Sequence, residues 1–173
     1  RGVSLPMRFA RASVESQPLG VVGIVAPWNY PLSLALMPLA TALAAGNRAM
    51  IKPSELTPAT SELLISLISE TFNEDEVAVV TGDAAVGATF AALPFDHLFF
   101  TGSTAVFQQL WRSVGDNITG YKQYPRLVGE TGGKDFIFAH PSANVDALAV
   151  AILRGGFEFQ GQKCSAASRV YVP

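Results

Sequence analysis

The chain has 173 residues, of which 49% are hydrophobic and 15% charged, and its formal net charge is −2. This length can bury a core and fits one domain or a large part of one. The near-neutral charge leaves no electrostatic footprint for nucleic acid, which is therefore not an expected partner. One cysteine and two histidines are too few for a structural zinc site, and no metal is expected.

The single cysteine also bears on location, because it cannot form an internal disulfide. A reducing compartment is expected: the cytoplasm or, in a eukaryote, the mitochondrial matrix. Residues 17–47 carry no charge, but Pro27, Pro31 and Pro38 interrupt them. A membrane helix needs about 20 uninterrupted apolar residues, so a strand, a loop and a helix are expected here, and no membrane.

Short β-branched runs alternate with helical patterns along the first hundred residues. Strands are predicted at 21–27, 48–53, 76–82 and 96–103. Helices are predicted between them at 31–46, 57–72 and 83–93. This alternation predicts an α/β fold with a doubly wound, mostly parallel sheet.

The pattern changes after Gly120. Residues 126–140 contain two strand-like pieces around a glycine turn. Residues 144–159 resemble a helix that Gly155 and Gly156 interrupt late. The doubly wound sheet is therefore expected to run into a second unit.

Ligands of such sheets bind outside the carboxyl ends of the strands. Three segments are expected there, namely APWN (26–29), KPSE (52–55) and FTGS (100–103). FTGS suits a phosphate, because free N–H groups and a helix dipole would point at it, although an ordinary turn has the same pattern. In KPSE, Lys52 and Glu55 either hold ribose hydroxyls or form a solvated turn in which Ser54 caps the next helix.

Cys164 lies in GQKC, among small and polar residues rather than in an apolar run. Most lone cysteines fill apolar space, so this placement favours a reactive thiol. A free cysteine has a pKa of about 8.5 and needs help from its site to ionise at neutral pH. His97 begins a predicted strand and His140 ends one, which argues against a Cys–His hydrolase.

Two further side chains are candidates for chemistry. Glu130 ends a predicted strand and precedes TGGK, where flexible backbone would let a carboxylate change position. Asn29 follows the first strand and would supply an amide donor. Taken alone, Glu130 also fits a surface carboxylate and Asn29 a turn asparagine.

The order of the motifs is more specific than any one of them. PWNYP, KPSE, FTGST, GETGGK and GQKC, in this order, resemble the aldehyde dehydrogenase superfamily from about residue 17 onward. The resemblance implies that the Cys164 thiolate attacks an aldehyde carbon. It further implies that Asn29 stabilises the resulting oxyanion and that Glu130 activates the water that hydrolyses a thioester.

The resemblance also implies a dinucleotide site. Lys52 and Glu55 match positions that contact the adenosine ribose, and Gly102 and Ser103 match positions that contact the pyrophosphate. The other residues assigned to the cofactor are Pro27, Trp28 and Ser54. Because a carboxylate at Glu55 would repel a 2′-phosphate, NAD is the expected cofactor, with NADP as the alternative.

The same resemblance predicts a partial dinucleotide-binding domain over residues 1–130 and the start of a catalytic domain over residues 131–173. Members of the family are longer at both ends, so the chain alone is expected to have little turnover. The full-length protein is expected to be a homodimer or homotetramer.

Two branches of the family are recognisable. Residues up to about 100 resemble the coniferyl aldehyde dehydrogenases, which act on aromatic or aliphatic aldehydes. Residues from about 101 resemble 1-pyrroline-5-carboxylate dehydrogenase, and Phe107 fits that branch. The nucleophile half makes L-glutamate γ-semialdehyde the expected substrate, with an aromatic or aliphatic aldehyde as the alternative. The change of branch near FTGS leads to the hypothesis of a chimera.

Two other functions remain open from the sequence. One is a nucleotide-binding module without turnover. The other is an acylating dehydrogenase that passes the thioester to coenzyme A, or a related acyl transferase. Glu130 argues against the acylating enzyme, which needs no hydrolytic base.

Overall fold

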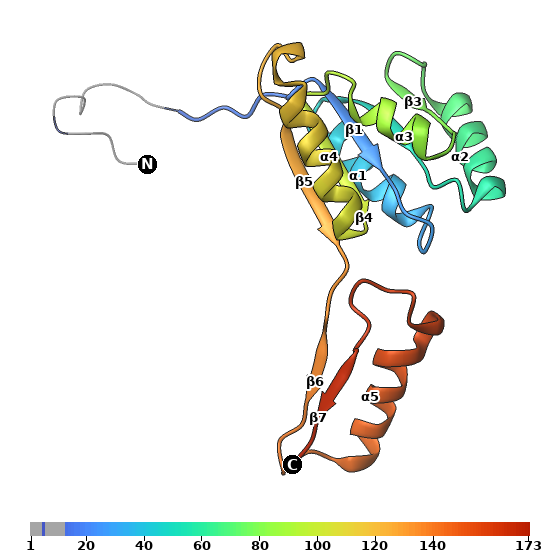
Figure 1. The fold of residues 1–173 in the computed structure, drawn as a ribbon, viewed down its shortest axis with the longest axis vertical. Helices are drawn as coiled ribbons and strands as arrows, with labels where there is room; N and C mark the ends of the chain where they lie inside the picture. Colours follow the sequence, from blue (N-terminus) through green and yellow to red (C-terminus); the bar gives the residue numbers. More distant parts are fainter. Residues whose placement is uncertain (1–4, 6–12) are drawn as a thin grey trace.

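A computed structural model describes Leu5 and residues 13–173 (Figure 1). The predicted first unit is thus described from residue 13 onward, apart from Leu5. The elements in chain order, with η for 3₁₀ turns, are β1 (Val21–Val25), α1 (Ser33–Ala44), β2 (Arg48–Lys52), α2 (Pro58–Thr71), β3 (Val77–Val79), α3 (Ala84–Ala91), β4 (His97–Gly102), α4 (Thr104–Asp116), η2 (Ile118–Gly120), β5 (Arg126–Thr131), β6 (Phe136–Phe138), α5 (Val145–Phe157), η3 (Glu158–Gly161) and β7 (Arg169–Tyr171).

The first five strands form one parallel sheet in the order β3-β2-β1-β4-β5. Helices α1 and α2 cover one face, and α3 and α4 cover the other (Figure 1). The predicted doubly wound parallel fold is therefore confirmed. The chain moves outward from β1 to β3 and then returns to the other side of β1 as β4. A crevice for ligands is expected where the direction reverses, outside the carboxyl ends of β1 and β4.

The alternation of side chains along the strands builds both halves of the core. Ile24 and Ile51 are fully buried against α1 and α2. Leu98 and Phe100, in β4, are buried against α3 and α4. Because successive strand residues point to opposite faces, Thr101 lies on the α1 side of the sheet.

After β5 the chain forms a second unit, in which α5 connects the parallel strands β6 and β7. Strand β7 is not among the predicted strands. The boundary expected between residues 130 and 131 lies one residue before the end of β5 and stays a prediction. Helix α5 continues through Gly155 and Gly156, so the predicted interruption is wrong. These glycines instead allow close packing, since Ala167 N donates to Gly155 O at 2.9 Å.

Two further expectations concern the uncharged segment and the third strand. Residues 17–47 contain β1, a loop and α1, as their prolines predict. Among the described helices, none is long and apolar enough to cross a membrane. The strand predicted at 76–82 is shorter, because β3 ends at Val79 and the chain turns at Gly82, whose φ is +150°.

Candidate active site

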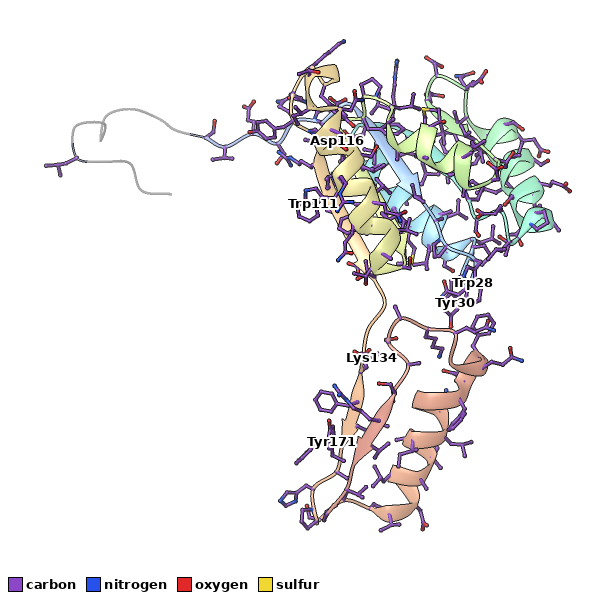
Figure 2. The ribbon with its side chains drawn as sticks, viewed as in Figure 1. Trp28, Tyr30, Trp111, Asp116, Lys134 and Tyr171 are labelled. Carbon is purple, nitrogen blue, oxygen red and sulfur yellow. The ribbon has the colours of Figure 1, made fainter. Side chains whose placement is uncertain are left out.

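A cleft of about 620 Å³ lies outside the carboxyl ends of β1, β2, β4 and β5. Trp28 and Tyr30, on the loop after β1, lie at the end of the sheet that faces the second unit (Figure 2). The cleft is lined by all ten residues predicted for the site: Pro27, Trp28, Asn29, Lys52, Ser54, Glu55, Gly102, Ser103, Glu130 and Cys164. The fold therefore brings together motifs that are far apart in the sequence.

The nucleophile loop reaches the cleft through a tight left-handed turn. Phe159, Gln160 and Gly161 have φ values of 53°, 59° and 70°. This region favours glycine and costs about 1 kcal/mol or more for other residues, so surrounding contacts must hold the turn. One such contact is aromatic: the ring centroids of Tyr30 and Phe159 lie 5.1 Å apart. Beyond the turn, the side chain of Cys164 is exposed.

Asn29 connects the loop after β1 to the nucleophile loop. Its Nδ2 donates a hydrogen bond to Gln162 O at 2.9 Å, two residues before Cys164. A primary amide carries two N–H groups, so one donor of Asn29 holds the loop and the other is left for a ligand in the cleft. An anionic oxygen bound beside Cys164 would be a suitable acceptor.

The glycine turn after β5 also contacts the nucleophile. Gly133 N donates to Cys164 O at 3.1 Å. A Cβ at position 133 would lie only 2.6 Å from the same oxygen, so no larger residue fits without a shift of backbone. Glu130, three residues earlier, is exposed in the cleft. The thiol, the amide and the carboxylate thus face one space.

Lys52 ends β2 and Glu55 follows it on the next turn, and both line the cleft. Lys52 is only 4% exposed, and its Nζ donates to Pro53 O at 2.9 Å and approaches Glu55 Oε2 at 3.5 Å. Its remaining hydrogen-bonding capacity and the half-exposed carboxylate suit a polyhydroxyl group such as a ribose.

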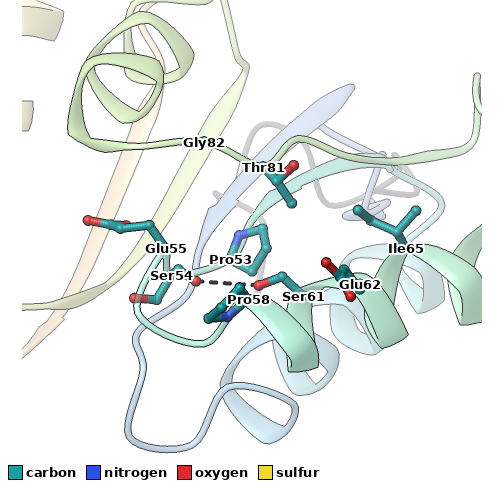
Figure 3. A pocket seen from close by; sticks show the side chains of 9 residues that line it. All are labelled: Pro53, Ser54, Glu55, Pro58, Ser61, Glu62, Ile65, Thr81 and Gly82. Carbon is teal, nitrogen blue, oxygen red and sulfur yellow. Dashed lines mark hydrogen bonds between the residues drawn. The ribbon is translucent and has the colours of Figure 1, made fainter.

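Ser54 is partly committed to the turn itself. Its Oγ accepts from Leu56 N at 3.2 Å, and its carbonyl accepts from Ser61 Oγ at 3.3 Å (Figure 3). The N-cap of α2 is Thr57, so the alternative in which Ser54 caps this helix is wrong. A small pocket of about 230 Å³ lies beside this turn, and its lining includes both Glu55 and Glu62 (Figure 3).

The segment FTGS joins β4 to α4, as predicted. Ser103 is the N-cap of α4, and its Oγ accepts from Val106 N at 3.3 Å. Other N–H groups of the first turn have no partner within a helix and carry the positive end of its dipole. Next to them, an apolar slot of about 280 Å³ opens between α3 and α4, and Lys52, Glu55 and Val106 line both the slot and the cleft.

Several residues at the site are not among the predicted ones. Lys163 lines the cleft beside the nucleophile and pairs with Glu158, which also pairs with Arg154. The hydrogen bond from Lys163 and the charge of both cations lower the pKa of Glu158, and Glu158 raises the pKa of Lys163. The sequence signal for these two ion pairs is their spacing, since Arg154 stands four residues before Glu158 and Lys163 stands five residues after it. Gln162 acts through its backbone carbonyl, for which a sequence has no signal.

A groove adjoins the cleft on the α1 side of the sheet. It has a volume of about 570 Å³ and is lined mostly by apolar residues of α1 and β4, including Leu34, Met37, Pro38 and Phe99. Glu130 lines both the groove and the cleft. Among the described residues, no group of three or more His, Cys, Asp or Glu side chains is arranged to hold a metal ion.

Comparisons with known proteins agree with this architecture. The model of the aldehyde dehydrogenase family matches residues 2–173. The coniferyl aldehyde dehydrogenase of Pseudomonas sp. (strain HR199 / DSM 7063) is 49% identical over 95% of this chain and 33% of its own length. A probable delta-1-pyrroline-5-carboxylate dehydrogenase of Schizosaccharomyces pombe is 39% identical over 92% of this chain and 30% of its own length.

Solved structures show the same relationship. An aldehyde dehydrogenase of Bacillus cereus in complex with NAD⁺ has a TM-score of 0.80 and 31% identity, over 89% of this chain and 31% of its own. The chain thus spans about a third of the length of the curated relatives it matches. Relatives of both branches match on both sides of residue 101, and the chimera remains a hypothesis. The chain belongs to the aldehyde dehydrogenase family.

Proposed function

We propose that this chain carries the nucleotide site and the nucleophile of an enzyme that oxidises an aldehyde to a carboxylic acid with NAD. The observation that carries the proposal is the presence of Cys164, Asn29 and Glu130 in one cleft. In this proposal, residues 1–130 belong to the dinucleotide-binding domain and residues 131–173 begin the catalytic domain. The cytoplasmic location and the homodimer or homotetramer remain predictions.

The first half of the reaction makes the aldehyde carbon tetrahedral. The Cys164 thiolate adds to the carbonyl carbon, a C–S bond forms, and the π electrons move to the oxygen. The free N–H of Asn29 and the backbone N–H of Cys164 stabilise this oxyanion, and the loss of one such donor typically costs on the order of 10² to 10³ in rate. When the C=O bond re-forms, the C–H electron pair leaves as hydride and a thioester remains on Cys164.

The second half releases the acid. Glu130 takes a proton from water, the hydroxide adds to the thioester carbon, and the C–S bond breaks to return the thiolate. Glu130 is exposed in the same cleft as the thiol and precedes a glycine turn, so it has both access to water and freedom to approach the thioester. Its position supports hydrolysis over transfer to coenzyme A.

The cleft has the groups that a dinucleotide needs. NAD, when bound, supplies the acceptor for the hydride. Lys52 and Glu55 suit a ribose, the first turn of α4 suits a pyrophosphate, and the apolar slot between α3 and α4 suits a flat adenine ring. A 2′-phosphate near Glu55 would also face Glu62, which supports NAD over NADP.

For the substrate, we favour an apolar or aromatic aldehyde. The apolar groove beside Glu130 offers space for such a group, and the coniferyl aldehyde dehydrogenase is among the relatives. L-Glutamate γ-semialdehyde, the substrate expected from the sequence, is the second candidate. It is supported by Lys163, a cation that precedes the nucleophile in the chain and lines the cleft, although Glu158 already pairs with it.

The test uses the full-length product of the gene. NADH formation is measured with a benzaldehyde-type substrate and with glutamate semialdehyde, and Cys164→Ala is expected to abolish both. Glu130→Gln is expected to leave one burst of NADH and then stall. If NAD binds but no aldehyde gives NADH, the chain is a nucleotide-binding module instead. A steady state that appears only with coenzyme A would support the acylating alternative.

A further inference from the structure

One buried polar group near the cleft has no role in the proposed reaction. Thr101 is 8% exposed, and its Oγ1 is buried without a hydrogen-bond partner among the described residues. A buried hydroxyl that has lost its bonds to water and gained none in return is rare in native proteins. Thr101 lines both the cleft and the apolar groove, and its Oγ1 atom is itself shielded from solvent.

The sheet register places Thr101 directly beside Glu130. The two residues are partners in the parallel pairing of β4 with β5. Side chains of paired residues in neighbouring strands project from the same face, with backbones about 4.8 Å apart. Both residues accordingly line the same two cavities. A glutamate side chain is long enough to span the distance to a hydroxyl on its register partner in the neighbouring strand.

The other polar groups on this face are further from the base. His97 also has a buried nitrogen without a partner among the described residues, but it pairs in register with Arg126 at the opposite end of β4. Phe99, between His97 and Thr101 on this face, has no polar group. Thr101 is therefore the side chain of β4 that can engage Glu130 near the nucleophile.

We propose that Thr101 is a positioning residue for Glu130: its hydroxyl donates to the carboxylate when Glu130 turns from solvent toward the thioester on Cys164. This inference rests on the proposed function. The bond relieves the unpaired hydroxyl and selects one orientation of a flexible base.

The experiment compares Thr101→Val and Thr101→Ser in the full-length gene product. Valine has nearly the same shape without the hydroxyl, and serine keeps the hydroxyl. With aldehyde and NAD in rapid mixing, Thr101→Val should keep the initial burst of NADH. Its later steady state should slow about 10-fold to 100-fold, the loss expected for a hydrogen bond to a charged group. Thr101→Ser should remain within about threefold of the wild type.

The two phases of NADH formation separate positioning from a merely structural role. A structural defect would slow the burst and the steady state alike, whereas the loss of a positioned base in Thr101→Val slows the steady state alone. In a Glu130→Gln background, Thr101→Val should have no further effect on the slow phase. Thr101→Ala is the second variant if Thr101→Val does not fold, and it should show the same loss of the steady-state rate.

The outcomes are distinguishable. A wild type that makes no NADH from any aldehyde refutes the proposed function. An active wild type whose steady state is unchanged in Thr101→Val refutes the role of Thr101 alone. A loss of the burst itself in Thr101→Val also refutes it, because the hydroxyl would then serve the first half of the reaction.

Discussion

The ring of Phe107 lies where a side chain at position 129 would have to be. A Cβ on Gly129 would come within 2.5 Å of two atoms of this ring. The ring cannot easily move away, because it stacks on Phe100 at 5.6 Å and meets Trp111 edge-on at 5.8 Å. A large residue on α4 and a glycine on β5 therefore form one complementary contact, and it lies next to Glu130.

We predict that Gly129→Ala destabilises the protein by about 1–3 kcal/mol, since the added methyl overpacks a filled space. Chemical denaturation measures the free energy of unfolding. The cost should shrink in a Phe107→Ala background, where the ring is absent. Gly115→Ala is the control: no atom lies within 4 Å of that Cβ, and alanine in a helix is favoured by up to about 1 kcal/mol. Equal costs with and without the Phe107 ring would contradict the contact.

In the glycine turn after β5, alanine substitutions at the neighbouring positions 132 and 133 should have different effects on stability. Gly133→Ala places a methyl 2.6 Å from Cys164 O and threatens the bond from Gly133 N to that oxygen. It should cost about 1–3 kcal/mol of unfolding free energy. Gly132→Ala meets no atom within 4 Å and should cost less than about 0.5 kcal/mol.

Hydrogen exchange locates the same effect. The amide of Gly133 should exchange faster in Gly133→Ala than in the wild type, because its acceptor on Cys164 has been pushed away. Gly132→Ala should leave that exchange rate unchanged. If both variants were equally mild, the contact between the turn and the nucleophile loop would not be the reason for a glycine at position 133.

The parts of the fold that were predictable have local signals. The strands β1, β2 and β4 are short β-branched or aromatic runs, and the helices between them have apolar residues at helical spacing. Strand β7 has no such signal, since Arg169–Tyr171 is brief and half exposed, and it is held by pairing with β6. Gly155 and Gly156 gave the wrong signal, because packing against Ala167 outweighs their low helix propensity.

The site shows the same division. All ten residues that the motifs singled out line the cleft. The reason is that parallel strands place their carboxyl ends at one edge of the sheet. The contacts that fix the geometry were not predictable. The side chain of Asn29 donates to the carbonyl of Gln162, which lies 133 residues further along the chain. The backbone N–H of Gly133 donates to the carbonyl of Cys164. Every residue has such a carbonyl, so the sequence does not indicate which one is used.

Cofactor preference should depend on the charge at Glu55. We predict that Glu55→Gln raises the ratio of kcat/KM for NADP to kcat/KM for NAD by about tenfold, since one of two carboxylates near the proposed 2′-position is neutralised. Steady-state kinetics with both cofactors measures this ratio. Glu70→Gln is the control, because Glu70 lies near the far end of α2 and accepts a bond from Ser66 Oγ at 2.9 Å. An unchanged ratio would show that Glu55 does not determine the preference for NAD over NADP.

Stability should fall in mild acid because of His97. Burial, and then the charge of Arg126, lower its pKa, so the unfolded chain binds a proton more readily than the folded protein. The free energy of unfolding is therefore at its full value above the unfolded-state pKa of about 6.5, where the ring is neutral in both states. It decreases as the pH falls below that value, because the unfolded chain then takes up a proton more readily. His97→Gln should therefore flatten the decline in unfolding free energy between about pH 7.5 and 5.5. An unchanged decline in His97→Gln would assign the loss of stability in acid to another group.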